Sequence, residues 1–397
     1  MAAYLGWMLD AFDHFLLVMV VGHIADDFHT KLSAVSYAFF LTLAMRPVGA
    51  LLFGVFADRC GRRPALMASI LLYSVIELLS GFAPSLGAFL ALRAVFGIGM
   101  GGVWGVGASL AMESVPANSR GFLSGILQQG YPAGYLLAAL AYWLAYPHFG
   151  WRGMFFIGAL PAFLILFIRS GVQESPAWVR EHARPADGAP RRTRRAALSV
   201  REHLPRFLFM IALVALFNAF SHGTQDLYPS GFLEKQRGLP RGAVTMIVVI
   251  YNLGAISGGI LFGAISQWIG RRRAIASASL LAIPLIPFWV GTGSVAALAA
   301  SAFFFQFAVQ GAWGVVPAHL NELSPRAVRG TFPGLAYQLG NLCASFVTTL
   351  QARLAEGHGN DYARVLGWVV AATAVLLAAL ALAGPEARAA ELAPEAT

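Results

Sequence analysis

Gly54-Val-Phe-Ala-Asp-Arg-Cys-Gly-Arg-Arg63 decides the fold, because a degenerate copy of this stretch returns later in the chain. The copy, Gly263-Ala-Ile-Ser-Gln-Trp-Ile-Gly-Arg-Arg272, starts 209 residues further on, counted from position 54 to position 263. The same offset aligns three more pairs of residues: Trp104 with Trp313, Glu113 with Glu322, and Arg120 with Arg329. Repetition at a single offset indicates an internal duplication. We therefore expect two related halves.

Long apolar runs fill most of the chain between these motifs. Of the 397 residues, 58% are hydrophobic and only 12% are charged, against about 25% charged residues in soluble domains. Twelve runs are long enough to cross a bilayer as helices, and the alternation typical of outer-membrane strands is missing. The predicted spans are 4–25, 34–57, 64–83, 85–112, 121–146, 151–170, 206–228, 243–268, 274–293, 296–320, 330–352 and 363–384. We expect an all-α membrane protein with twelve transmembrane helices in two pseudo-symmetric six-helix bundles.

The basic residues concentrate in alternate loops, which is the asymmetry that orients membrane proteins with their basic loops in the cytoplasm. The formal net charge of +9 therefore reports topology and does not indicate nucleic-acid binding. We expect an N-terminal bundle over residues 1–170, a cytoplasmic linker over 171–205, a C-terminal bundle over 206–384 and a cytoplasmic tail over 385–397. Both termini would lie in the cytoplasm. The protein would be a monomer in the lipid bilayer of the cell (inner) membrane.

One face of the seventh predicted span is polar. It carries four side chains at helical spacing, Asn218, Ser221, His222 and Gln225, with Asp226 at its edge. Such groups are costly in hydrocarbon, so they turn toward partners or toward water. One interpretation is a seam of hydrogen bonds between helices. The other interpretation is a pathway for a solute or for protons, and two titratable groups on one helix favour it.

Other spans carry further polar residues that suit an anion and protons. The first contains Asp10 and Asp13, and the second contains Arg46 near its middle. The planar guanidinium of an arginine binds a carboxylate through two parallel hydrogen bonds. Buried acids and histidines change their proton affinity with their exposure. Amide and phenol side chains of the fifth, tenth and eleventh spans either line the same path or hold helices together.

The Gly54–Arg63 loop, its copy after the eighth span, and an ExxxxxxRG loop after the fourth span resemble the major facilitator superfamily. The resemblance covers essentially the whole chain and implies the major facilitator fold. It also implies that the loop after the second span is a cytoplasmic gate, whose residues here are Gly54, Asp58, Arg59, Arg62 and Arg63. Because Gln267 replaces Asp58 in the second copy, we expect the second latch to be weaker.

The fourth span repeats a small or basic residue every four positions, at Arg93, Gly97, Gly101 and Gly105. Glycines at this spacing predict close helix packing. The RxxxGxxxG arrangement is similar to a motif in proton-coupled members of the superfamily. Two interpretations stay open: Arg93 holds a coupling carboxylate, or it forms a structural pair with Glu77 of the third span.

The stretch Asn218-x-x-Ser221-His222-x-Thr224-Gln225-Asp226 is similar to the seventh-helix signature of Jen-type carboxylate:proton symporters, in the sialate:proton symporter family, with Ser230 where that signature has threonine. The resemblance implies symport of small monocarboxylates (lactate, pyruvate, acetate) with protons by alternating access, by a protein that is not an enzyme and uses no cofactor or metal. The expected substrate-binding residues are Arg46, Asn218, His222, Gln225, Gln338, Asn341, Tyr131 and Gln310. The expected proton-coupling residues are Asp10, Asp13, Asp226, Arg93 and Glu77. Sialic acid, another organic acid or a sugar are alternative cargoes, and a non-transporting membrane sensor is a distant alternative.

Overall fold

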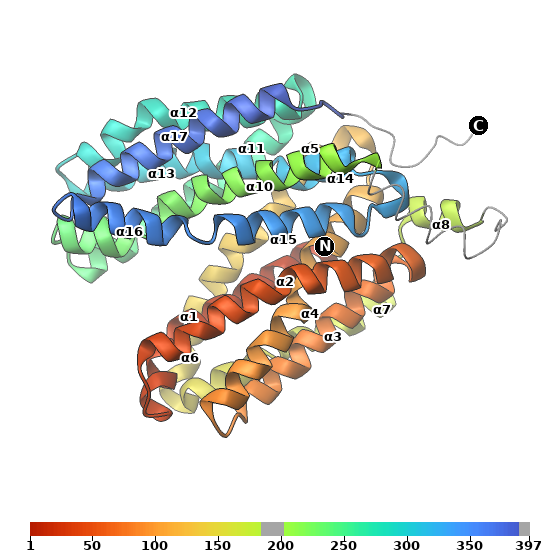
Figure 1. Ribbon diagram of the computed structural model, residues 1–397, viewed down its shortest axis with the longest axis horizontal. Coiled ribbons are helices and arrows are strands. Elements are labelled where there is room, and N and C mark those ends of the chain that lie inside the picture. Colours follow the sequence, from red (N-terminus) through yellow and green to blue (C-terminus); the bar gives the residue numbers. More distant parts are fainter. Residues whose placement is uncertain (184–201, 389–397) are drawn as a thin grey trace.

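A computed structural model describes residues 1–183 and 202–388. The middle of the predicted linker, 184–201, and most of the predicted tail, 389–397, lie outside the described residues. In the described part every regular element is a helix (Figure 1).

The first six predicted spans fall on helices of the N-terminal bundle. These are α1 (Ala2–Asp27), α2 (Leu32–Cys60), α3 (Arg62–Gly81), α4 (Leu86–Glu113), η1 (Ala117–Ser119), α5 (Arg120–Gln128), α6 (Gly130–Ile157), η2 (Leu160–Phe163) and α7 (Leu164–Gly171). Inside α6, Gly150 has φ 60° and ψ −168°, a conformation that favours glycine. This turn divides α6 between the predicted fifth and sixth spans.

The short helix α8 (Pro176–Ala183) follows, and the C-terminal bundle contains the other six predicted spans. Its elements are α10 (Leu204–Gln225), the π-helix η3 (Tyr228–Gln236), α11 (Arg241–Ile269), α12 (Arg271–Gly291), α13 (Val295–Trp313), α14 (Val316–Leu323), η4 (Arg326–Val328), α15 (Phe332–Ala344), α16 (Val347–Gly357) and α17 (Tyr362–Ala383). The predicted tenth and eleventh spans are therefore each broken into two helices.

By length and hydropathy alone, nine helices of the described residues can cross a membrane, or ten if the bent pair Ala117–Ile157 and Leu160–Gly171 is one span. The prediction counted twelve runs because hydropathy does not register breaks within a run. Breaks shorten the individual helices of the fifth, sixth and eleventh predicted spans. The predicted all-helical architecture of two bundles is confirmed.

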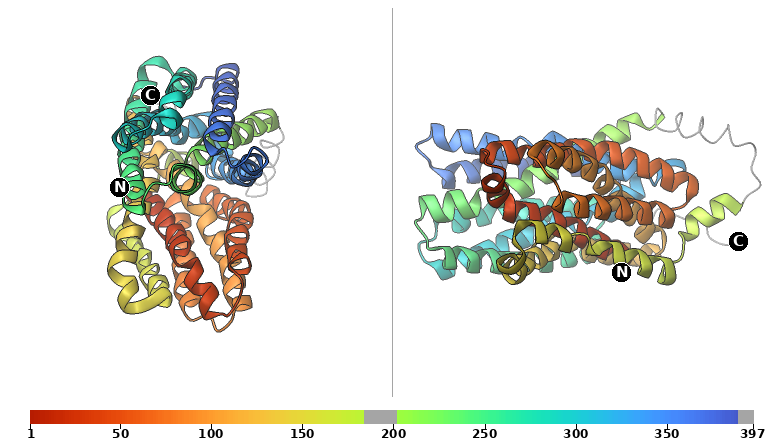
Figure 2. Two further views of the ribbon diagram at one scale, coloured as in Figure 1. Left: turned by 90° about the vertical axis from the view of Figure 1, so that its left-hand side faces the viewer. Right: turned by 90° about the horizontal axis from the view of Figure 1, so that it is seen from below.

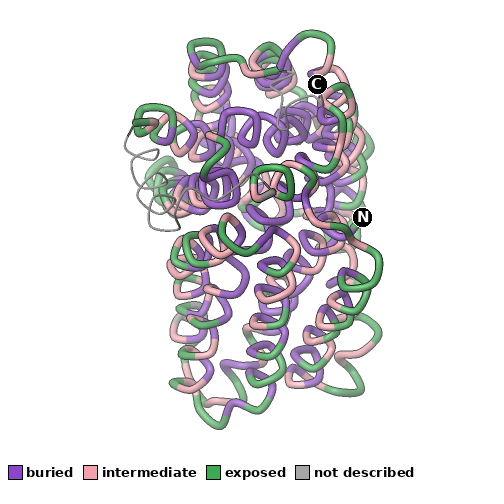
Figure 3. Tube along the Cα trace, turned by 90° about the vertical axis from the view of Figure 1, so that its right-hand side faces the viewer, coloured by how far each residue is buried: buried purple, intermediate pink, exposed green. Residues whose placement is uncertain are grey.

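The two bundles lie side by side, and the helices of the N-terminal bundle run obliquely to those of the C-terminal bundle (Figures 1 and 2). Within them, α2 packs on α4 and α1 on α6, as α11 packs on α13 and α10 on α15. Between them, α2 and α4 meet α15, while α5 meets α11 and α14. Buried residues lie where helices face one another, and exposed residues lie on the periphery (Figure 3). We call the end that carries α8 the linker end and the opposite end the far end.

The internal repeat appears as a repeated ion pair at the linker end. Arg62 Nη2 lies 3.1 Å from Glu113 Oε1, and Arg271 Nη2 lies 2.9 Å from Glu322 Oε1. Both pairs have side chains that are at most 3% exposed. Arg62 and Arg271, like Glu113 and Glu322, are 209 residues apart in the sequence. The internal duplication is therefore visible in the structure as well as in the sequence.

Each half also has a carboxylate at the start of its third helix. Glu174, just after α7, accepts hydrogen bonds from the backbone N–H groups of Arg62 (2.9 Å) and Arg63 (3.0 Å). Glu386, just after α17, accepts one from the N–H of Arg272 (3.1 Å). A negative charge is stabilising at a helix N-terminus because the unpaired N–H groups point toward it. The segments that follow the two bundles therefore hold α3 and α12 in the same way.

Candidate functional site

Arg46 projects from the middle of α2 and is only 6% exposed. Its Nη2 atom lies 3.7 Å from Asp10 Oδ1 on α1 and 3.3 Å from the sulfur of Met100 on α4. Its Nε atom has no hydrogen-bond partner among the described residues. This buried cation therefore keeps donor capacity for a further acceptor.

Arg93 is fully buried in α4 and pairs with the third helix. Its Nη2 atom donates to Glu77 Oε2 (2.7 Å) and to Ser80 Oγ (2.5 Å). Its guanidinium carbon lies 4.1 Å from the centroid of the Phe96 ring, within range of a cation–π interaction. The predicted ion pair with Glu77 is therefore formed, and the proposed role of Arg93 in proton coupling stays a prediction.

Asp13 is a second buried acid beside this pair. It is 0% exposed, and neither carboxyl oxygen has a hydrogen-bond partner in the part of the chain that the structure describes. A Cβ placed on Gly158 would lie 3.1 Å from Glu77 Oε1 and 3.2 Å from Asp13 Oδ1. Both carboxyl groups thus reach the same glycine, and Asp13 also interacts electrostatically with Asp10 and Arg93.

In the C-terminal bundle, hydrogen bonds join the polar face of α10 to α15, a helix that also meets α2. Asn218 Nδ2 donates to Asn341 Oδ1 (2.5 Å), and Asn341 Nδ2 donates to Gln338 Oε1 (3.3 Å). Gln338 is 2% exposed. The three predicted amides form one connected row on two helices of the C-terminal bundle.

The same face of α10 is also tied to α13. Gln225 Nε2 donates to Gln306 Oε1 (3.1 Å), and Gln310 Nε2 donates to Ser221 Oγ (3.0 Å). Gln225 and Gln310 therefore already have partners within their own bundle. Gln306 belongs to the same network, although it was not among the predicted binding residues.

His222 and Asp226 lie near the far end of α10. His222 Nδ1 is 3.2 Å from Asp226 Oδ1, and Thr348 of α16 donates to Asp226 Oδ2 (2.5 Å). Their side chains are 43% and 33% exposed. The protein therefore encloses these two side chains only in part.

Two residues of the N-terminal bundle lie near both Arg46 and the C-terminal bundle. Tyr131 of α6 lies within electrostatic range of Arg46, Asp10 and Asp226. His14 of α1 lies within range of Arg46, His222 and Asp226. Arg46 and the His222–Asp226 pair thus belong to one region between the bundles. Asp13, Glu77 and Arg93 form a second cluster inside the N-terminal bundle, and the interaction of Asp13 with Asp10 links it to Arg46.

An aromatic cluster crosses between the bundles on the linker side of this region. Trp104 of α4 stacks on Tyr337 of α15, with ring centroids 3.8 Å apart and planes at 18°. Trp7 stacks on Tyr131 and meets Tyr337 edge-on, and Trp313 meets Tyr337 at 5.9 Å. The repeated Trp104 and Trp313 gave a signal for this cluster, whereas nothing in the sequence singled out Trp7.

The predicted gate loop joins the bundles at the linker end. Asp58 accepts hydrogen bonds from the Gly330 N–H (2.7 Å), the Thr331 N–H (3.1 Å) and the Thr331 hydroxyl (2.7 Å). Thr331 is the N-cap of α15. Arg62 donates to Asp58 as well (2.9 Å). A Cβ on Gly54 would meet the Thr331 Cα at 2.6 Å, so the helix ends are in close contact.

Gln267, which corresponds to Asp58, makes the equivalent contact from the C-terminal bundle to the N-terminal bundle. Its Oε1 accepts from the Gly121 N–H (2.8 Å), and its Nε2 donates to the Ala117 carbonyl (2.6 Å). The linker end is therefore closed by two latches. Among the other predicted gate residues, Arg63 donates to the Arg169 carbonyl, and Arg59 is exposed.

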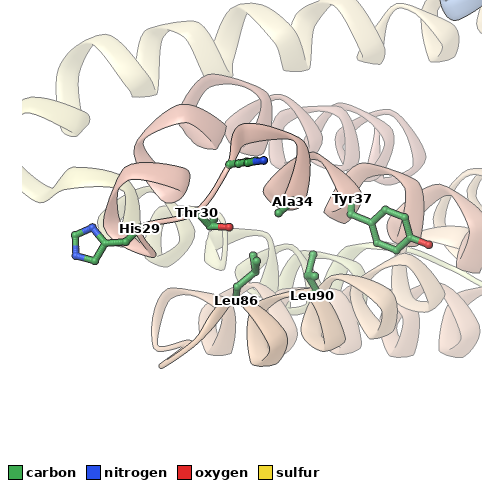
Figure 4. Close-up of a pocket in the computed structure, with 7 residues that line it drawn as sticks. His29, Thr30, Ala34, Tyr37, Leu86 and Leu90 are labelled. Atoms are coloured by element: carbon green, nitrogen blue, oxygen red, sulfur yellow. The ribbon is translucent and has the colours of Figure 1, made fainter.

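A shallow surface pocket of about 640 Å³ lies apart from this site, at the far end of the N-terminal bundle (Figure 4). The turn between α1 and α2, the start of α2 and the start of α4 line it. Within residues 1–183 and 202–388, no group of three or more His, Cys, Asp or Glu side chains is arranged to hold a metal ion.

Comparison with known proteins identifies the family. The model of the Major Facilitator Superfamily matches residues 3–348. The "Carboxylic acid transporter protein homolog" of Saccharomyces cerevisiae is 28% identical over 414 residues, which cover 96% of this chain and 67% of that protein. The "Sialic acid transporter NanX" of Escherichia coli is 30% identical over 345 residues, which cover 85% of this chain and 82% of the relative.

Among solved structures, the proton:xylose symporter XylE has a similar fold. It aligns with a TM-score of 0.71 at 20% identity over 98% of this chain and 95% of that chain. At this identity the likeness shows the fold alone. Because the family model matches most of the sequence, the chain belongs to the major facilitator superfamily of membrane transporters.

Proposed function

We propose that this chain, a secondary transporter and not an enzyme, carries small monocarboxylates such as lactate, pyruvate and acetate together with protons by alternating access. The observation that carries the proposal is Arg46, a buried arginine with an unpartnered Nε. It faces a region that it shares with the opposite bundle, through His14, Tyr131 and Asp226. The names of two relatives, a carboxylic acid transporter homolog and a sialic acid transporter, support an acidic cargo.

In this proposal the carboxylate binds to the guanidinium of Arg46. A charge-assisted pair of this kind is about twice as strong as a neutral hydrogen bond. The remainder of the substrate then contacts the C-terminal bundle through the row Asn218–Asn341 and through His222. A ligand that touches both bundles can favour their closure around it, because its contacts differ between the open and the closed state.

The proton is assigned by balancing the buried charges of the N-terminal bundle. Apart from Arg62, Glu113 and Arg120 at the linker end, the buried charged residues of this bundle are three acids, Asp10, Asp13 and Glu77, and two arginines, Arg46 and Arg93. Asp10 lies beside Arg46 and Glu77 is bound to Arg93, so Asp13 lacks a countercharge of its own. An isolated charge in a dry interior is far more costly than a neutral acid. We therefore propose that Asp13 carries a proton in this state and releases it when the linker end opens.

The closed linker end and the exposed His222–Asp226 pair support an assignment to the state that receives substrate at the far end. Release then requires Trp104 to separate from Tyr337 and Asp58 to separate from Thr331. The basic loops at the linker end support its orientation toward the cytoplasm. Both termini would then be cytoplasmic, with the protein acting as a monomer in the inner membrane.

The substrate assignment is tested with the purified protein in proteoliposomes. Labelled lactate, pyruvate, acetate, sialic acid, cis,cis-muconate and xylose are offered across an inward proton gradient, with and without a protonophore. We expect gradient-dependent uptake of the small acids. Arg46→Lys keeps the charge but loses the planar fork, so the apparent affinity for lactate should fall by about tenfold or more. Uptake of xylose alone, or an unchanged affinity in Arg46→Lys, would refute a carboxylate site at Arg46.

The proton assignment is tested by separating exchange from accumulation. Asp13→Asn mimics the protonated acid, so it should still exchange labelled for unlabelled lactate across the membrane. It should not accumulate lactate when a proton gradient is imposed. Asp226→Asn is the comparison variant, since that acid is already bound by His222 and Thr348. Normal accumulation in Asp13→Asn would exclude Asp13 as the proton carrier.

A further inference from the structure

The far-end pocket of Figure 4 has two chemically different walls. One wall is the polar turn between α1 and α2, with His29, Thr30 and Lys31. The other is apolar, and Leu86 and Leu90 of α4 point toward Thr30 and Ala34 across the pocket. Such a combination suits a ligand with a polar head and a hydrocarbon chain.

The polar wall favours a negatively charged head. Lys31 is exposed and is the N-cap of α2, and its side chain makes no capping hydrogen bond. The first N–H groups of an uncapped helix attract anions through their partial positive charge. The ammonium group of Lys31 and the hydroxyl of Thr30 add further donors to the same turn.

The acids nearby limit how much negative charge the pocket accepts. Asp27 is already bound to Arg152, at 2.6 Å. Asp26 is exposed one turn before Lys31 and would repel a second negative charge. A singly charged phosphodiester therefore fits the turn better than a phosphomonoester.

The position of the pocket selects a lipid as its occupant. Helices α1, α2 and α4 all cross the membrane, so their shared end lies at the level of the lipid head groups. Tyr37 is 54% exposed on the next turn of α2, and tyrosine is enriched at this depth. We propose that the pocket binds an anionic phospholipid, whose phosphodiester contacts Lys31 and Thr30 and whose acyl chain lies on Leu86 and Leu90.

The test uses the delipidated full-length chain in detergent and measures its thermal unfolding. Phosphatidylglycerol, phosphatidylcholine with the same acyl chains, and inorganic phosphate are titrated separately. A ligand that binds only the folded state raises Tm, and the rise increases with the ratio of its free concentration to its Kd. We expect phosphatidylglycerol to raise Tm more than phosphatidylcholine, with no rise from phosphate alone.

The chain offers a matched control, because its only two lysines are Lys31 and Lys235. Lys235 lies in η3 at the same end of the other bundle. Lys31→Gln should lose most of the extra shift with phosphatidylglycerol, whereas Lys235→Gln should keep it. Equal loss in both variants, no loss in Lys31→Gln, or the same shift with inorganic phosphate would each overturn the proposal. The readout does not involve transport, so it stands apart from the proposed substrate.

Discussion

The two bundles match at the linker end and differ at their centres. Arg62 with Glu113 and Arg271 with Glu322 form the same buried ion pair at corresponding positions. Halfway through the membrane the match ends. At the same sequence offset of 209, positions 10, 13, 46, 77 and 93 fall on Ala219, His222, Ala255, Ile286 and Ala302 of the C-terminal bundle.

This difference indicates which tasks the duplicated halves share. Both must close the linker end, and both keep the residues for it. The buried acids and arginines concentrate in the N-terminal bundle, whereas the C-terminal bundle presents mainly amides, such as the row Asn218–Asn341–Gln338. Gln338 corresponds to Gln129, so the amide is shared there although the surroundings are not. At the centre of the protein, buried charged groups therefore belong to one bundle and uncharged hydrogen-bonding groups to the other.

The largest expected effect tests the charged centre of the N-terminal bundle. Arg93→Ala leaves Glu77 buried without its partner, which should lower the free energy of unfolding by about 3–5 kcal/mol. The matching substitution in the other bundle, Ala302→Gly, should cost about 0.5–1 kcal/mol. Thermal unfolding in detergent, followed by helicity, measures both. Adding Glu77→Gln to Arg93→Ala should recover part of the loss, and equal costs at positions 93 and 302 would contradict the asymmetry.

A smaller effect tests the contact between bundles at the linker end. A Cβ on Gly105 would lie 2.5 Å from the Gly334 Cα, whereas a Cβ on Gly107 would meet Ala3 at an ordinary 3.5 Å. Gly105→Ala should therefore destabilise the closed linker end by about 1–3 kcal/mol, and Gly107→Ala should not. The check is the distance between spin labels at two exposed positions, Arg59→Cys and Arg273→Cys, with both native cysteines replaced by serine.

The expected result is a longer label distance in Gly105→Ala and an unchanged distance in Gly107→Ala. Identical distributions in both variants would mean that backbone contact between α4 and α15 does not hold the linker end closed.

The smallest effect compares the two latches. Asp58→Asn makes the first latch neutral like the second, and should cost about 1 kcal/mol, because charge-assisted hydrogen bonds are roughly twice as strong as neutral ones. Gln267→Ala removes two neutral hydrogen bonds and should shift the same label distances by a similar or smaller amount. A larger shift in Gln267→Ala would show that the second latch is not the weaker one.

Features with a regular spacing could be predicted from the sequence. The length of the apolar runs predicted the membrane helices. The offset of 209 residues between positions 54 and 263 predicted the two related halves. The helical spacing placed His222 and Asp226 near one face of the seventh span, and in the structure their side chains are in contact. The partnership of Arg93 with Glu77 was one of two interpretations, because spacing along a chain does not say which of several buried acids is nearest.

Other features depend on contacts that no spacing encodes. Trp7 faces Tyr131 and Tyr337 only because α1 packs on α6 beside the second bundle. The close approach of Gly105 to Gly334 joins residues of different halves. The predicted face of α10 proved to be divided, since Asn218 bonds to α15 while Gln225 bonds to α13. Helical periodicity predicts which residues share one face of a helix, but not how many neighbouring helices that face contacts.

The carboxylate of Glu386 has a practical consequence for handling this protein. It binds the first turn of α12 from only three residues beyond the last helix, and Arg388 donates to the Trp268 carbonyl next to it (2.5 Å). A purification tag or a fluorescent protein fused directly to Ala383 would delete this brace, while one joined after Arg388 would retain it. A fusion site chosen from the end of α17 alone would therefore weaken α12, a helix of a different predicted span.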